Sequence, residues 1–317
     1  MMNMMKNLTT EDINTFVETQ LAHWELAAVN FNNLRNAYRK NMNFCGLRGA
    51  VQLNPARIIS SAANTSAKAI EERPCFLCEA NRPAQQITNQ WVSGWHLLLN
   101  PYPILPIHFT IVNPIHTPQA EIPLEMAAMA EAAPDLVFFY NGARAGASAP
   151  DHQHVQAVLK SELPLVRLVE ENHPISKSGW MSSEDYDLEL PFHFVSAVVE
   201  PDSRGMKTLA LCLKAFGIDS ETGVQDNGLL NAFMWIGNEG LLRIVIIPRR
   251  KHRPECYFKE GEDRIIISPG AIDMAGLVII PRPSDFGKVT PEIINDIYSQ
   301  VAFSEKLPQE IKDYFLS

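Results

Sequence analysis

Two histidines and a glutamine form the strongest chemical signal in the sequence. Residues 152–156 read HQHVQ and are expected to lie on a strand over 152–158. Side chains alternate between the two faces of a strand, so His152, His154 and Gln156 are expected to share one face. Such a row of polar groups is costly unless it is solvated, hydrogen-bonded or used. The spacing favours a site, although a lone His-x-His pair also occurs on surfaces or as a metal pair.

The loop ahead of these histidines is rich in small residues. Residues 141–148 read NGARAGAS. Small residues let the backbone approach a ligand closely, and successive N–H groups in such a loop can bind an anion. Gly146 and Arg144 are therefore candidates for nucleotide binding, and the Ser148 hydroxyl adds a donor for catalysis. A phosphate-binding loop beside histidines is typical of phosphoryl or nucleotidyl transfer.

A neutral imidazole can carry out this transfer as a nucleophile. A hydrogen bond to one ring nitrogen leaves the other free to attack. His154 is expected to attack the α-phosphorus of a nucleotide, while Gln156 and the loop N–H groups bind the non-bridging oxygens. A second phosphorylated substrate would then accept the nucleotide, so ping-pong kinetics are expected.

A Cys-x-x-Cys turn at residues 75–78 predicts a metal site. Two thiolates at this spacing suit one tetrahedral zinc ion. The sequence has no second such pair, so histidines must complete the site. His116 and His152 are the first candidates, and His108 and His96 are alternatives that could instead be core histidines. We expect structural zinc with four protein ligands.

Positive charge near the site has two sources in the sequence. Arg48 and Arg57 lie in an extended stretch before the cysteines and are candidates for nucleotide binding. Residues 249–253 read RRKHR and follow an expected strand. Such a run is usually a solvated face, but in an acidic chain it could also be the cationic wall that a polyphosphate needs.

Composition limits the partners of the chain. Its 317 residues are 46% hydrophobic and 20% charged, with a formal net charge of −9. A protein that coats nucleic acid needs a basic face, so we expect small-molecule nucleotide and phosphate substrates and no nucleic acid. No stretch approaches the roughly 20 apolar residues of a membrane span, and the N-terminus lacks a secretory signal. We therefore expect a cytoplasmic protein without a membrane segment.

Local patterns predict an α+β protein. Residues 10–38 have helical spacing, whereas residues 95–100, 108–113 and 135–141 are short apolar runs typical of strands. The polar segment 160–187 is expected to link an N-terminal half, residues 1–160, to a C-terminal half, residues 161–317. In the second half we expect a helix over 207–216, a hairpin across 237–240 and strands over 264–268 and 275–281.

The chemical segments resemble one known superfamily. Residues 139–142 (FYNG), 146–148 (GAS) and 152–156 (HQHVQ) are similar to the active-site segment of galactose-1-phosphate uridylyltransferases and diadenosine tetraphosphate phosphorylases. Both families belong to the histidine-triad (HIT-like) superfamily. The resemblance implies two HIT-like halves, each a mainly antiparallel sheet with helices packed on it, with the nucleophile in the first half alone.

The resemblance also implies roles for individual residues. His154 matches the nucleophile, whereas Gln156 and Ser148 match residues that touch the phosphate. Asn141 matches an asparagine beside the nucleotide. Asn100, in the segment LNPYP at 99–103, matches one that contacts the nucleoside.

Further segments resemble one family or the other. Residues 75–78 and 113–116 are similar to the zinc-binding pieces of the uridylyltransferases, with His152 as the fourth ligand, whereas residues 267–276 are similar to the C-terminal segment of the dinucleotide phosphorylases. Analogy with the uridylyltransferases also implies a possible homodimer. The segment from Ser148 to His152 is one residue longer than in these families.

The substrate therefore stays open between two classes. We expect a nucleotidyltransferase or phosphorylase that acts on a nucleoside-diphosphate sugar or a dinucleoside polyphosphate through a covalent nucleotidyl-histidine. The acceptor would be phosphate or a sugar phosphate. The alternatives are a metal-dependent phosphohydrolase, with His152 and His154 both binding a catalytic metal, and a non-catalytic nucleotide-binding protein.

Overall fold

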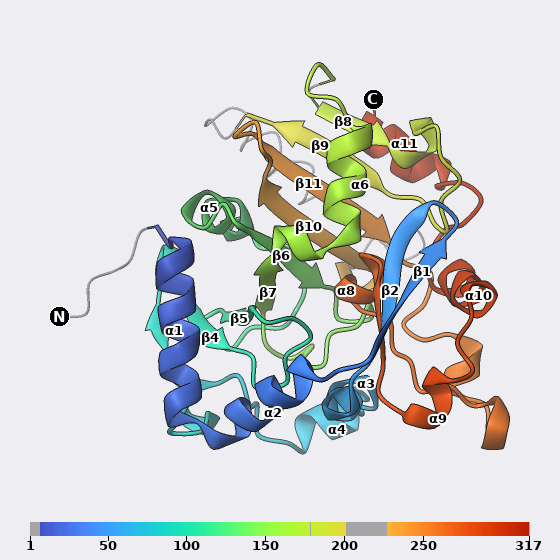
Figure 1. Cartoon of the computed structure of the whole chain (residues 1–317). Coiled ribbons are helices and arrows are strands. Elements are labelled where there is room, and N and C mark those ends of the chain that lie inside the picture. Colours follow the sequence, from blue (N-terminus) through green and yellow to red (C-terminus); the bar gives the residue numbers. More distant parts are fainter. Residues whose placement is uncertain (1–6, 178, 201–226, 317) are drawn as a thin grey trace.

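A large antiparallel sheet forms the centre of the protein (Figure 1). The computed structural model describes residues 7–177, 179–200 and 227–316. In these residues, nine strands follow the order β3-β4-β5-β7-β6-β10-β11-β9-β8. The strands are β3 (Asn89–Gln90), β4 (His96–Leu99), β5 (His108–Val112), β6 (Leu136–Asn141), β7 (His154–Leu159), β8 (Gly179–Ser182), β9 (Val195–Val199), β10 (Leu230–Ile236) and β11 (Leu242–Pro248).

Both faces of this sheet are covered, which explains its continuous apolar strands. Every residue of β6 is buried. Leu136 and Phe138 belong to a core shared with α1, α2, α5 and α11, whereas Val137 and Phe139 belong to a core shared with α6, α8 and α10. A strand buried on both faces needs apolar side chains at successive positions. The helices are α1 (Thr10–His23), α2 (Glu25–Arg35), α3 (Ile58–Ser61), α4 (Ala67–Glu71), α5 (Glu125–Ala132), α6 (Pro164–Asn172), α8 (Ala271–Met274), α9 (Pro283–Phe286), α10 (Pro291–Val301) and α11 (Gln309–Leu316).

A second, three-stranded sheet joins distant parts of the chain. It has the order β1-β2-β12, with β1 (Arg39–Phe44), β2 (Leu47–Leu53) and β12 (Leu277–Ile280). The β12 strand runs parallel to β2, so residues 277–280 lie beside residues 50–53 (Figure 1). The Gly276 carbonyl, just before β12, accepts the Ala50 N–H at 2.9 Å, and the Ile280 carbonyl at the end of β12 accepts the Asn54 N–H at 3.0 Å.

The expected fold class is confirmed, since mainly antiparallel sheets carry helices on their faces. The opening helix is interrupted at Trp24, and residues 264–268 do not form the expected strand. The expected hairpin across residues 237–240 joins β10 and β11. The helix expected over 207–216 lies outside the described residues.

The division into residues 1–160 and 161–317 stays a prediction. The central sheet continues across this boundary, because β6 pairs with β10 over five residue pairs from Val137↔Trp235 to Asn141↔Asn231. The expected linker, residues 160–187, contains the amphipathic helix α6. In the part of the chain that is described, the helices are too short or too polar to cross a membrane.

Candidate active site

One pocket of about 500 Å³ brings together most of the expected site residues. The central sheet supplies one wall, through Asn100, Thr110, Phe139, Asn141, His154 and Gln156. Segments that precede or follow the small sheet supply the facing wall, including Arg57 and residues 268–273. Seven predicted residues line the pocket: Arg57, Asn100, Asn141, Gly146, Ser148, His154 and Gln156.

His154 is held in the protonation state that nucleophilic attack requires. Its Nδ1 lies 2.8 Å from the His152 carbonyl oxygen. A carbonyl oxygen can only accept, so Nδ1 carries the proton and the lone pair is left on Nε2. Burial is the main reason that the pKa of His154 is lowered to about 4. The ring is therefore neutral at neutral pH.

Gln156 is oriented by a buried histidine on the neighbouring strand. Nδ1 of His108 accepts the N–H of Ile104 at 3.1 Å, so His108 Nε2 carries the proton and donates it to Gln156 Oε1 at 2.8 Å. The oxygen end of the Gln156 amide is thereby engaged. Its NH₂ end is left to donate to a ligand oxygen.

A glutamine separates the ends of the two central strands. The pairing of β6 with β7 ends at Phe139↔Gln156. Beyond that pair, the buried Gln119 amide donates to the carbonyls of Asn141 and His154, both at 2.9 Å, and accepts the His154 N–H at 2.9 Å. These side-chain bonds replace ladder bonds where the strands diverge. They fix the backbone of both Asn141 and His154.

The small-residue loop packs closely against the segment just before α8. Gly146 has φ +97°, and a Cβ there would lie 2.5 Å from Gly270 Cα. Both the backbone conformation and the contact therefore require glycine. Asn141 Oδ1 accepts the Ala271 N–H at 2.7 Å and the Asn231 Nδ2 at 3.0 Å. Asn141 thus joins the end of β6 to β10 and to the start of α8 at the edge of the pocket.

Of the three arginines expected to bind the nucleotide, one lines the pocket and two are exposed elsewhere. Arg57 lines the pocket and donates to the Tyr102 carbonyl at 2.9 Å. Burial lowers the pKa of Arg57 to about 10, so it stays charged at neutral pH. Arg48 on β2 and Arg144 in the loop have exposed side chains and are absent from the described pocket lining.

Residues 249–253 are expected from the sequence to form either a solvated face or a cationic wall of the site. They are absent from the described pocket lining, and two of their arginines make hydrogen bonds inside the protein. Arg249 is 3% exposed, and its guanidinium donates to Asn231 Oδ1 and to the carbonyls of Pro269 and Val301. Arg253 donates to Ser268 and to the Ala63 carbonyl. These two arginines link segments around the pocket.

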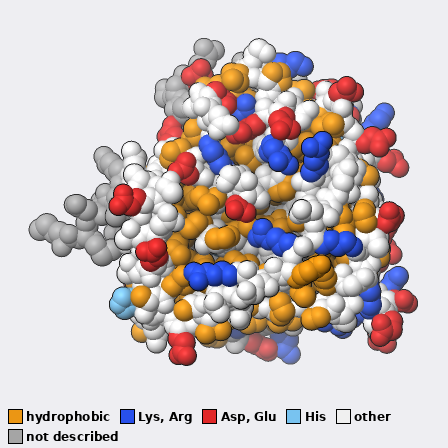
Figure 2. Space-filling model, viewed as in Figure 1, with side chains coloured by type: hydrophobic (Ala, Val, Ile, Leu, Met, Phe, Trp, Pro, Cys, Tyr) orange, Lys and Arg blue, Asp and Glu red, His pale blue; other side chains and the backbone are white. Residues whose placement is uncertain are grey.

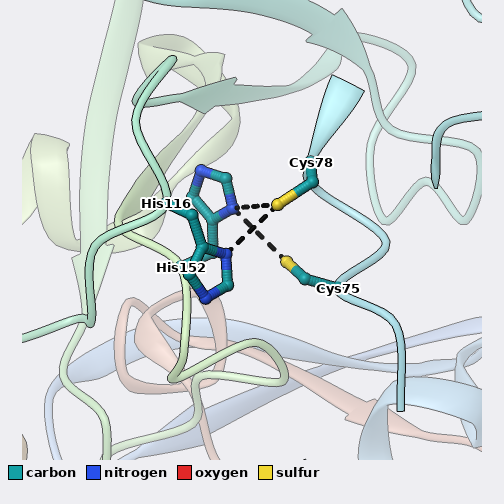
Figure 3. Close-up of side chains that lie close together, drawn as sticks. All are labelled: Cys75, Cys78, His116 and His152. Atoms are coloured by element: carbon teal, nitrogen blue, oxygen red, sulfur yellow. Dashed lines mark hydrogen bonds between the residues drawn. The ribbon is translucent and has the colours of Figure 1, made fainter. Parts of the chain in front are cut away.

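The cysteine pair lies with two histidines in a group that can hold a metal ion (Figure 3). One ligand atom from each of Cys75, Cys78, His116 and His152 lies within 4.8 Å of the others. The sulfur-to-Nδ1 distances are 3.2–3.5 Å. A tetrahedral ion with Zn–S and Zn–N bonds of about 2.3 and 2.1 Å would place these atoms about 3.5 Å apart. His152 Nε2 donates to the Asn113 carbonyl at 2.8 Å, which leaves the Nδ1 lone pair facing the sulfurs.

The expectation that His152 shares a face with His154 is wrong. The strand begins at His154, and His152 lies in a bend whose N–H donates to the Ala149 carbonyl at 3.2 Å. The bend turns the His152 ring to the cysteines, while His154 and Gln156 line the pocket. Alternation of faces applies only inside a regular strand.

Charge is unevenly distributed over the surface. Figure 2 shows Lys and Arg side chains across the middle of one face among hydrophobic ones, with most Asp and Glu side chains toward the periphery. Although the net charge of the chain is −9, anions are therefore favoured locally where these cationic side chains gather.

Several residues of the pocket region were not predicted from the sequence. His108 and His96 are the alternative metal ligands expected from the sequence. In the structure, His108 orients Gln156 and His96 contacts Arg82. Asp273 lines the pocket, and burial raises its pKa to about 6. Only the resemblance over 267–276 pointed to that segment. Arg73 and Gln119 had no signal in the sequence.

Among the comparisons with known proteins, only the solved structures bear on the fold. A family model described as a domain of unknown function (DUF4922) matches residues 16–159. No curated protein sequence matches the chain. Among solved structures, Ap4A phosphorylase Apa2 from yeast is similar with a TM-score of 0.53 at 13% identity, over 88% of this chain and 96% of that one.

Two complexes of the same yeast enzyme give the same result. The complex with AMP has a TM-score of 0.52 at 14% identity, over 90% of this chain and 96% of that one. The complex with Ap4A has a TM-score of 0.53 at 14% identity, over 88% and 96%. The resemblance expected from the sequence is therefore confirmed at the level of the fold: this chain has the fold of yeast Ap4A phosphorylase.

Proposed function

We propose that the protein is a nucleotidyltransferase that carries a nucleoside monophosphate on His154. The observation that supports this most directly is the buried His154 ring, which lines the pocket with its Nδ1 proton engaged by the His152 carbonyl. The resulting lone pair on Nε2 makes the ring a nucleophile. A dinucleoside polyphosphate is the favoured donor, because the similar solved structures are those of an Ap4A phosphorylase.

The proposed reaction has two displacements at the α-phosphorus. His154 Nε2 attacks phosphorus, the P–O bond to the leaving phosphate breaks, and the leaving group keeps the electron pair. The phosphate acceptor's oxygen then attacks the same phosphorus, and the P–N bond breaks to restore neutral imidazole. The Gln156 NH₂ and the Ser148 hydroxyl would stabilise the charge on the non-bridging oxygens. The His152 carbonyl would stabilise the cationic ring of the intermediate.

We propose zinc as the ion of the Cys75, Cys78, His116 and His152 group. Two thiolates and two imidazoles are a common structural zinc set. The ion would join the cysteine turn to the segment just before His154. With all four positions taken by protein ligands, its contribution would be structural.

The metal-dependent hydrolase alternative has less support. It needs His152 and His154 to bind the same ion, but the His152 ring faces the cysteines and His154 Nδ1 faces a carbonyl. The carboxylate beside them, Asp151, is paired with Arg73. Both arrangements favour nucleotidyl transfer over a catalytic ion at these histidines.

The decisive experiment is to trap the nucleotidyl-histidine. Wild type and His154→Ala are incubated with α-³²P-labelled dinucleoside polyphosphates and, separately, nucleoside-diphosphate sugars. Wild type should form an acid-labile adduct, whereas His154→Ala should form none and lose about 10³-fold or more of its turnover. His23→Ala, at an exposed helical position, is the control and should label as wild type does.

Each outcome separates the alternatives. Labelling of His154→Ala at the wild-type level would contradict the proposed nucleophile. Tight nucleotide binding by wild type without any adduct would favour the non-catalytic binding protein. Labelling by a sugar nucleotide alone would replace the favoured donor class.

A further inference from the structure

Arg73 places a guanidinium in the pocket that the reaction at His154 does not use. It lines the same pocket as His154 and Ser148. It lies two residues before Cys75, so the cysteine group positions its backbone. The guanidinium is also held by the Phe76 ring, whose centroid lies 5.0 Å from Arg73 Cζ.

The ion-pair partner of Arg73 is Asp151, which lies between Ser148 and His152. Arg73 Nη2 donates to Asp151 Oδ1 at 2.5 Å. Asp151 belongs to the stretch from Ser148 to His152 that is one residue longer than in the resembling families. The ion pair is largely buried, with side-chain exposures of 25% and 13%. It therefore holds the cation against the end of the phosphate loop.

Part of the guanidinium remains without a hydrogen-bond acceptor. Arg73 Nη1 is buried and has no partner among the described residues. A buried charged donor without an acceptor is unfavourable, and the planar guanidinium suits the oxygens of a phosphate. A ligand that reaches Nη1 would have to displace the groups that bury it, among which the Phe76 ring lies over the guanidinium and belongs to a residue that is 47% exposed.

A second cation lies at a different part of the same pocket. Arg57 is anchored on the Tyr102 carbonyl near Asn100, whereas Arg73 is anchored on Asp151 near the histidines. The N–H groups of Gly142, Arg144 and Ala145 already donate to backbone carbonyls, so the donors proposed for the phosphate at His154 are the Gln156 NH₂ and the Ser148 hydroxyl, which line the pocket. Additional cations in the lining are then suited to additional phosphates.

We propose that Arg73 binds phosphate groups beyond the one attacked by His154, so that the site selects nucleotides with a chain of phosphates. The inference rests on the proposed function for the position of the attacked phosphate. It names a specificity residue for that site and the class of substrate that it selects.

The test compares mono- and triphosphates of the same nucleoside. Affinities of wild type and Arg73→Met for the four ribonucleoside monophosphates and triphosphates are measured by calorimetry. Wild type should prefer at least one triphosphate over its monophosphate. Arg73→Met should lose about tenfold to a hundredfold in triphosphate affinity and less than about threefold in monophosphate affinity. Arg73→Lys should recover part of the preference.

Two matched variants separate charge from structure. Arg82→Met removes a guanidinium that contacts the same cysteine segment through the Leu77 carbonyl but is absent from the described pocket lining, and it should keep the triphosphate preference. Asp151→Asn removes the ion pair and keeps the cation, so triphosphate affinity should be retained or increased. Arg73→Met losing both affinities equally, or neither, would overturn the assignment. So would a wild type without any triphosphate preference.

The His154 adduct is measured in the same samples. A triphosphate preference that depends on Arg73, without any adduct, would contradict the proposed transfer and leave the Arg73 assignment standing. An adduct in wild type, with a preference that Arg73→Met does not change, would contradict the Arg73 assignment alone.

Discussion

His108 determines which end of the Gln156 amide faces the pocket. The Ile104 N–H and the Gln156 oxygen take up both ring nitrogens, so the ring has no lone pair left to accept a further proton. Burial, with a contribution from nearby Arg57, lowers the pKa of His108 to about 3. Protonation at Nδ1 would break the hydrogen bond from the Ile104 N–H, whereas the Nε2–H would still donate to Gln156.

Because the pKa of His108 is lowered in the folded protein, the free energy of unfolding should depend on pH in a specific way. The unfolded chain binds a proton at His108 near pH 6.5, whereas the folded chain does so only near pH 3. The stabilisation is thus present above pH 6.5 and is lost as the pH falls toward 3. Between pH 6.5 and 5, His108 should lower the free energy of unfolding by about 2 kcal/mol.

Urea unfolding at a series of pH values checks this expectation. His108→Asn should be less stable at pH 7, but its stability should fall less steeply below pH 6.5 than that of wild type. His23→Asn, at an exposed position, should run parallel to wild type. Parallel curves for His108→Asn and wild type would show that His108 does not titrate in this way.

At the scale of elements, Gln119 holds the ends of β6 and β7 apart where both strands reach the pocket. Gln119 bridges the two strands where their pairing stops, and the cysteine turn binds the segment just before β7 through His152. Gln119 therefore holds the His154 backbone at both its N–H and its carbonyl, while the cysteine turn contacts His152 two residues earlier. Loss of either contact should disturb the site.

The cysteine group gives the corresponding prediction. Cys78→Ser should abolish stoichiometric zinc, measured by plasma mass spectrometry, and lower the melting temperature by roughly 5–10 °C because a cross-link between two loops is lost. A chelator should bring wild type to the same temperature. Cys45→Ser, an exposed cysteine outside the group, should match wild type in both measurements. Equal zinc in Cys78→Ser and wild type would contradict this assignment.

At the scale of the whole molecule, the site is assembled from segments that lie far apart in the sequence. Asn231 on β10 donates to Asn141 Oδ1 and to the Ala145 carbonyl, and accepts from Arg249 at 2.7 Å. Arg249 in turn donates to the Pro269 carbonyl, next to Gly270, which contacts Gly146 in the small-residue loop. A single buried network thus connects the loop with the segment that closes the pocket.

Removal of the Asn231 amide should break this hydrogen-bond network. Asn231→Leu would leave buried donors and acceptors of Asn141, Ala145 and Arg249 without partners, so the free energy of unfolding should fall by about 3 kcal/mol. Nucleotide affinity should fall as well, because the loop loses its support. Asn238→Ala, in the exposed hairpin turn, should change stability by less than about 0.5 kcal/mol. A stable Asn231→Leu variant would show that the network is dispensable.

The sequence by itself determined the elements and the chemical types of the site. Short apolar runs bounded by Pro and Asn, and turns with glycine, are local signals, so most strands and the 237–240 hairpin could be predicted. The spacing of 75–78 and 152–156 likewise predicted a metal group and a nucleophile within one short stretch. Both depend on neighbours in the chain.

Only the tertiary structure decided which distant residues meet. Arg57 and Arg48 look alike in the sequence, but a turn after β2 directs Arg57 into the pocket, while Arg48 on the strand stays exposed. The pairing of Arg73 with Asp151 spans 78 positions, and the contact of Gly146 with Gly270 joins the small-residue loop to the segment before α8. Such contacts arise from packing between elements, and residue type and spacing carry no information about them.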